Sequence, residues 1–196
     1  MKICGIACAI FKEEIDKLKE KGKVKIPIYY IESSLHIYPE KLKSVMSEMI
    51  TKLEKEFDII ILIYGDCHAS IIDWDKKENI KKVKGVNCVE MLLGKKEYRK
   101  RRKEKCFFLL PEWVVKWEDI FKNHLGLNEK IGKEIMKEVH DKLVYVDTGI
   151  IDVPKKDLDD VSDFTGLNYS IMNINLDILE EKIEECIGDE TKDECK

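Results

Sequence analysis

The run Asp58-Ile-Ile-Ile-Leu-Ile-Tyr-Gly65 constrains the fold more than any other feature of this 196-residue chain. A continuous aliphatic and β-branched stretch is typical of a strand that is covered on both faces, as in a parallel sheet. Shorter β-rich runs on either side of it alternate with segments of helical periodicity, which indicates β-α units. The sequence therefore predicts an α/β fold: a three-layer, Rossmann-like open sheet, mainly parallel, with helices on both faces.

The spacing of apolar residues and the positions of Gly and Pro give the expected elements. Strands are expected at 1–4, 25–31, 58–64, 83–87, 106–110, 143–147 and 170–174, and helices at 5–22, 40–53, 88–94, 112–124, 129–142 and 177–186. A chain of this length can bury roughly 70% of its extended surface in one core. With no internal repeat and no linker-like segment, we predict a single domain over residues 1–187 and a frayed tail at 188–196.

Composition excludes several classes of protein. Hydrophobic residues make up 44% of the chain, which excludes disorder as the dominant state. The longest apolar runs fall far short of the ~20 residues that a transmembrane helix needs. The N-terminal sequence does not resemble a secretory signal, and the seven cysteines are an odd number. Together these observations predict a cytoplasmic protein with reduced thiols.

Thiols and an imidazole follow the expected strands. Ligands of open α/β sheets bind beyond the carboxyl ends of the strands, and Cys4, His36, Cys67 and Cys88 are expected there. Thiolate and imidazole are donors that suit zinc and iron, so the sequence predicts an iron-sulfur cluster or a thiolate-bound Zn or Fe. His68 and Cys8 are alternative ligands, and Asp147 and Thr148, at the end of a later strand, are expected to support the ligands by hydrogen bonds.

Other interpretations of these residues stay open. The chain has no C-x-x-C pair, and a free cysteine is often a small buried apolar residue. The site could instead belong to an enzyme or binding module for a small anionic metabolite, with Cys67 as nucleophile and His68 as base. Neither a dinucleotide-binding glycine motif nor a P-loop is present. Composition and spacing identify no other catalytic residue.

The segment Lys95–Lys105 holds eight basic residues in eleven. Two features argue against nucleic-acid binding: the chain is acidic, with a pI of about 5.7, and Tyr98 is the one aromatic residue in this run. A solvated loop or a docking face is the favoured interpretation. A third hypothesis is therefore an adaptor that docks an acidic partner through Arg99, Arg101 and Arg102.

A series of short motifs occurs in a specific order. They are Cys4-Gly5, Leu35-His36 with Pro39, Tyr64-Gly65-x-Cys67, Asn87-Cys88 with Met91-Leu-Leu-Gly94, Tyr98, Phe108-Leu with Pro111-x-Trp113, and Val146-Asp147-Thr148-Gly149. Over roughly residues 1–166 the chain resembles the family filed as domain of unknown function 1638. It departs from the family pattern at Asn87, where the family usually has Asp, and at His68-Ala-Ser, where the family has a glycine-rich continuation.

The resemblance implies a setting rather than a mechanism. Members of this family occur in methanogens and other anaerobes, among proteins of corrinoid-dependent methyl transfer and one-carbon metabolism. The resemblance therefore implies a role in electron transfer, metallocofactor handling or activation. The implied partner is a corrinoid or methyltransferase-system protein or a redox protein. It also favours Cys4, His36, Cys67 and Cys88 as the site.

Overall fold

The computed structural model describes residues 1–191, which form two compact units. Unit 1 combines Met1–Gly94 with the segment that begins at Leu176, and unit 2 is Lys95–Asn175. Each unit has its own parallel sheet. The predicted α/β fold with parallel strands and helices around them is confirmed, but the strands are divided between two sheets. The strands after residue 105 pair with one another in the second sheet, and the single domain over residues 1–187 stays a prediction.

The sheet of unit 1 has the strand order β2-β1-β3-β4, and all its neighbours are parallel. Its strands are β1 (Ile3–Cys8), β2 (Ile28–Ile31), β3 (Ile59–Ile63) and β4 (Ile80–Lys82). All five residues of β3 are buried, which confirms the prediction from the aliphatic run that this strand is central and covered on both faces.

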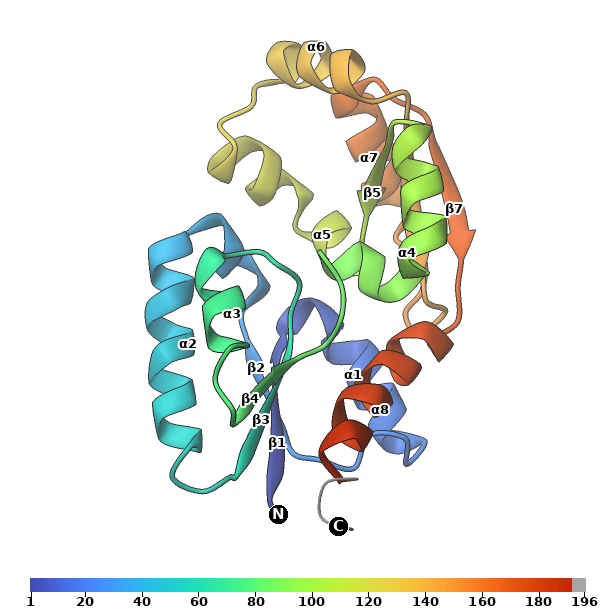
Figure 1. Cartoon of the computed structure of the whole chain (residues 1–196). Helices are drawn as coiled ribbons and strands as arrows, with labels where there is room; N and C mark the ends of the chain where they lie inside the picture. The colour runs from blue at the N-terminus through green and yellow to red at the C-terminus, as the bar shows by residue number, and fades with distance from the viewer. Residues whose placement is uncertain (192–196) are drawn as a thin grey trace. The chain divides into compact units, whose positions relative to one another are not determined.

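Helices cover both faces of this sheet. They are α1 (Lys12–Glu20), α2 (Pro39–Leu53), α3 (Ala69–Trp74), the first part of α4 (Cys88–Lys103) and α8 (Asp177–Thr191), with short 3-10 turns at Ala9–Phe11 and Ser33–Ile37. Figure 1 shows α2 and α3 on one face and α1 and α8 on the other. Leu42, Met46 and Ile50 of α2 pack with Ile60 and Leu62 of β3 in one buried cluster. Unit 1 is therefore a three-layer sandwich.

Unit 2 has a three-stranded parallel sheet in the order β5-β6-β7. Its elements are β5 (Cys106–Leu109), α5 (Pro111–Val115), a π-helical turn (Asp119–His124), α6 (Glu129–Val139), β6 (Lys142–Asp147), α7 (Lys155–Thr165) and β7 (Tyr169–Asn173). Residues of α5, α6 and α7 pack with Leu143 and Tyr145 in one core. On the other face, Phe108 of β5 stacks on Tyr98 of α4, with ring centroids 5.8 Å apart.

Several predicted boundaries are wrong. The first strand does not end at Cys4 but continues to Cys8. Gly5 lies against β2, where a Cβ would come 2.6 Å from Ile28 Cδ1, so the glycine serves strand packing and does not start a helix. The fourth strand comes earlier than the predicted 83–87.

The ends of two helices also differ from the prediction. The basic segment Lys95–Lys103 is helical, following a break at Gly94 (φ 75°, ψ 158°). Of the predicted frayed tail, residues 188–191 belong to α8, and residues 192–196 lie outside the described residues. Within residues 1–191, no helix combines the length and the apolar character that crossing a membrane requires.

Candidate thiol site at the carboxyl edge of the first sheet

The strand order of unit 1 creates a switch point between β1 and β3. From β1 the chain proceeds to β2 on one side, and from β3 it proceeds to β4 on the other. The loops that follow β1 and β3 therefore diverge, which is the arrangement that opens a ligand crevice in α/β sheets. Cys8 ends β1, Tyr64 and Cys67 follow β3, and Cys88 begins α4 after β4.

The register of the strands decides which N-terminal cysteine reaches this edge. Ala7 is the register partner of Ile63, so Cys8 and Tyr64 occupy the next step on two neighbouring strands. Cys4 is the register partner of Ile60. It lies four residues before Cys8, or about 13 Å along an extended strand. Two sulfurs on one zinc ion, each about 2.3 Å from it, can be at most ~5 Å apart. Cys4 therefore cannot share an ion with Cys8, and its predicted place at the carboxyl edge is wrong.

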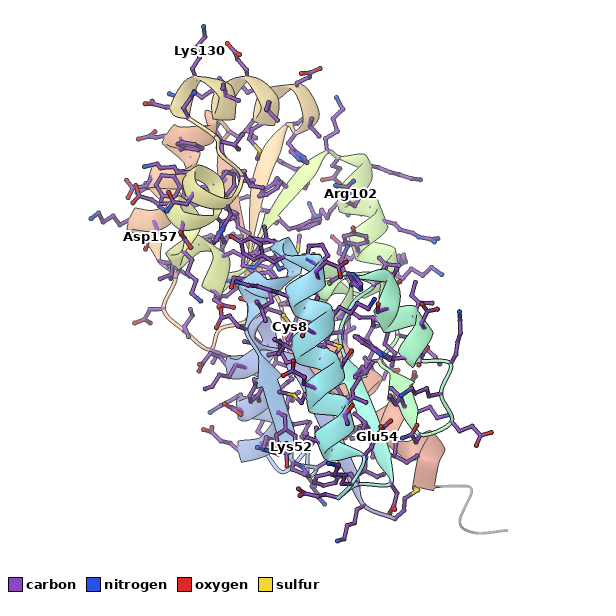
Figure 2. The ribbon with its side chains drawn as sticks, turned by 90° about the vertical axis from the view of Figure 1, so that its left-hand side faces the viewer. Cys8, Lys52, Glu54, Arg102, Lys130 and Asp157 are labelled. Atoms are coloured by element: carbon purple, nitrogen blue, oxygen red, sulfur yellow. The ribbon has the colours of Figure 1, made fainter. Side chains whose placement is uncertain are left out.

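Two thiols at this edge of the sheet affect the ionisation of a third. Burial raises the pKa of Cys88, and negative charge on Cys67 and Cys8 raises it further. Burial also raises the pKa of Cys67, as does the neighbouring Asp66 carboxylate. Such effects need proximity, so Cys8 and Cys67 both lie near Cys88, although the three come from separate segments of the chain. Figure 2 labels Cys8 within unit 1.

The Tyr64 side chain completes this cluster. Burial raises the pKa of its phenol, and the charges of Cys8 and Cys67 add to the effect. The side chain is only 2% exposed. The Cys8 thiol lies near enough to the hydroxyl to contribute to this pKa shift as a hydrogen-bonding group, but among the described residues the hydroxyl has no hydrogen bond of good geometry. Most buried hydroxyls have a partner, and an unsatisfied one costs about 1–3 kcal/mol. The hydroxyl therefore marks a place where a bound group or water would find a hydrogen bond.

Backbone contacts tie together the two loops that carry Cys67 and Cys88. A Cβ on Gly65 would lie 2.4 Å from the Cα of Asn87, so only glycine permits this approach. The Asp66 N–H donates to the Val86 carbonyl at 2.9 Å. The Lys82 ammonium forms an ion pair with the Asp66 carboxylate at 3.0 Å. The loop after β3 is thus held against the segment that follows β4.

The comparisons with known proteins bear on this site. A model of a family described as "Protein of unknown function (DUF1638)" matches residues 30–183. The chain belongs to this family. The DUF1638 match begins later than the predicted resemblance, which started at residue 1, and ends later too. It contains Tyr64, Cys67 and Cys88 and leaves Cys8 outside. Searches of curated proteins and of solved structures gave no match.

The two predicted histidine ligands of this DUF1638 protein have local structural contacts. His68 is the N-cap of α3, and its Nδ1 accepts a hydrogen bond from the Ser70 N–H at 3.0 Å. His36 lies in the 3-10 turn after β2, with Nδ1 2.5 Å from the Ser33 carbonyl.

Asp147 and Thr148, the predicted supporting residues, belong to unit 2 of the DUF1638 chain. They lie at the end of β6, where the Asp147 carboxylate accepts a hydrogen bond from the Gly149 N–H at 2.8 Å. That contact makes Asp147 a cap for its own turn. Cys106 is buried at the start of β5, as expected of a structural residue.

Among the described residues, no group of three His, Cys, Asp or Glu side chains is arranged to hold a metal ion. Tyr64 is the residue that sequence reasoning missed. The available signal was a hydroxyl-bearing side chain at the end of an otherwise aliphatic strand, directly before glycine.

Proposed function

We propose that this DUF1638 protein binds a thiophilic metal ion or an iron-sulfur cluster through Cys8, Cys67 and Cys88. One observation supports it above all. Three thiols come from separate segments to the switch point of a parallel sheet, beside a buried Tyr64 hydroxyl that interacts with the Cys8 thiol but has no hydrogen bond of good geometry among the described residues. Compared with the set predicted from the sequence, Cys8 takes the place of Cys4.

Electrostatics favours a cation at this cluster. Negative charge on Cys8 and Cys67 raises the pKa of the buried Cys88 thiol, so Cys88 stays protonated when no positive charge is present. A bound cation reverses this balance, because coordinated thiols are deprotonated outright. Three sulfur ligands suit zinc or iron and leave one coordination position for an outside ligand. The described side chains do not form a closed shell, so binding requires a change in the side chain of Cys67, which lies on the loop between β3 and α3.

The Tyr64 hydroxyl fits this proposal as a hydrogen-bond donor. A buried O–H that points at a coordinated sulfur satisfies its own donor capacity and stabilises the thiolate charge. The enzyme hypothesis based on Cys67 and His68 has less support. A nucleophilic cysteine needs a lowered pKa, whereas the pKa of Cys67 is raised. A metal centre at this place would suit electron transfer, metallocofactor handling or activation, and each of these roles stays a prediction.

The test is metal analysis of the full chain purified without oxygen, with an absorption spectrum and a cobalt titration. We expect stoichiometric zinc or iron in the wild type, and loss of metal in Cys8→Ser, Cys67→Ser and Cys88→Ser. Cys4→Ala and Cys186→Ser are the matched controls, since Cys4 lies on the same strand as Cys8 but outside the cluster. Circular dichroism confirms that each variant is folded.

Two results would contradict the proposal. A folded wild-type chain that holds only traces of metal and shows no cobalt–thiolate absorption would end it. Loss of metal from Cys4→Ala, together with full retention in Cys8→Ser, would return the site to the set predicted from the sequence.

A further inference from the structure

The second part of α4 presents a face that consists only of cations. We propose that this face docks an acidic segment of a partner protein. The basic face consists of Lys95, Lys96, Arg99, Lys100, Arg102 and Lys103, and it belongs entirely to unit 2. The proposal is independent of the thiol site.

Helical geometry places these six side chains together. At 3.6 residues per turn they fall within an arc of about 160° around the helix axis. All six are exposed, and none of them forms an ion pair that we find among residues 1–191. Three pairs of like charge lie four residues apart, a spacing at which like charges destabilise a helix. The pairs are Lys95 with Arg99, Lys96 with Lys100, and Arg99 with Lys103. The chain itself gives no described compensation for this repulsion.

The acidic residues of the segment are used elsewhere. Glu97 accepts a hydrogen bond from Arg101 Nε at 2.7 Å. Glu104 contacts Arg101 at 3.3 Å and also accepts from Lys142 of β6 at 2.9 Å. Arg101 is therefore neutralised within the chain, which removes it from the predicted docking set of Arg99, Arg101 and Arg102. The basic face keeps its full charge.

The partner's chemistry follows from the charge of the whole chain. Residues 95–105 contain eight basic and two acidic residues, a surplus of six positive charges in a chain of net charge −4. The remaining residues therefore carry ten more acidic than basic side chains. A long polyanion such as a nucleic acid would meet repulsion beyond the helix. Tyr98 is stacked on Phe108, so it is not available to stack on a base.

A short acidic segment matches the face better. Positions 95 to 103 span about 12 Å of helix axis, so one acidic helix or loop of similar length can cover the face without reaching further. Five of these cations, with Glu104, line an open hollow on the surface. Figure 2 labels Arg102 on this helix.

The test measures binding of a fluorescein-labelled oligo-glutamate peptide to the full chain by fluorescence anisotropy, at low and at high salt. We expect binding that weakens with salt, and a loss of roughly tenfold in affinity for the variant Arg99→Gln/Arg102→Gln/Lys103→Gln. The control variant Lys130→Gln/Lys155→Gln/Lys156→Gln removes the same charge from exposed positions elsewhere in unit 2, and we expect it to bind nearly as the wild type does.

Three outcomes would overturn the proposal. Equal losses in both triple variants would show that only net charge matters. Absence of binding at low salt would show that the face is merely solvated. Tighter binding of a DNA duplex, lost in the first variant alone, would assign the face to nucleic acid. Both variants keep all the cysteines, so metal content measured on the same samples separates a failure here from a failure of the thiol site.

Discussion

Replacement of Tyr64 by Phe should stabilise the protein. The hydroxyl is buried and has no hydrogen bond of good geometry in the described structure. Its contact with the Cys8 thiol is weak, because a thiol is a poor hydrogen-bonding group, and an unsatisfied polar group costs about 1–3 kcal/mol. Phe keeps the ring that packs in the core around α2 and β3. We expect the free energy of unfolding to rise by about 1 kcal/mol in chelator, which corresponds to an increase in Tm of roughly 2–4 °C.

Tyr30→Phe is the matched control for this prediction. Tyr30 lies in the same sheet, but its hydroxyl donates to the Asp16 carboxylate at 2.8 Å, so its removal should cost about 0.5–1.5 kcal/mol. Urea unfolding gives the overall change, and hydrogen exchange of β3 peptides reports unit 1 separately from unit 2. If Tyr64→Phe destabilises the protein as much as Tyr30→Phe does, the hydroxyl has a partner in the folded chain, and the argument for an incomplete site fails.

Two further predictions concern the same sheet. Burial of Cys4 raises its pKa to about 11 from an ordinary value of 9.0, so the folded state holds this proton more tightly than the unfolded state, and stability is lost as pH rises from about 9 to 11. In urea titrations, the wild type should lose about 1–2 kcal/mol more than Cys4→Ala between pH 8 and pH 10.5; equal losses would refute this. Gly65→Ala, whose Cβ would meet the Asn87 backbone, should lower the free energy of unfolding by about 1–3 kcal/mol. Gly188→Ala, a helical position with open space around it, should raise it by about 0.5–1 kcal/mol, and the opposite order of the two would contradict the close approach.

The fold class was predictable because the strongest signal was local. An aliphatic run with no polar residue has few alternatives to a central strand, and β3 confirms it. Helix α7 was missed because it buries only a few apolar residues, among them Leu158, Val161 and Phe164, in an otherwise polar segment. The division into two sheets was not predictable, because strand pairing depends on contacts between distant segments that periodicity does not encode.

The candidate site was predicted in part. Cys67 and Cys88 follow strands whose ends are well marked by glycine and helix signals, and the structure brings them together. The sequence predicted Cys4 instead of Cys8 because the end of the first strand was placed four residues too early. Ile6 and Ile10 have a spacing of four, which imitates a helix, while Ile6 is a strand residue. A register error along a strand moves a side chain by about 3.3 Å per residue, so four residues were enough to select the wrong thiol.

The discontinuity of unit 1 has a consequence for synthesis of the chain. Leu179 and Ile183 of α8 are fully buried, and α8 covers one face of the sheet that begins at residue 3 (Figure 1). This face can be closed only after the ribosome has produced residues beyond 176, whereas all of unit 2 is already available by then. The half of the protein that is translated first is therefore the last to be completed, and its uncovered apolar face is the part that a chaperone would need to shield.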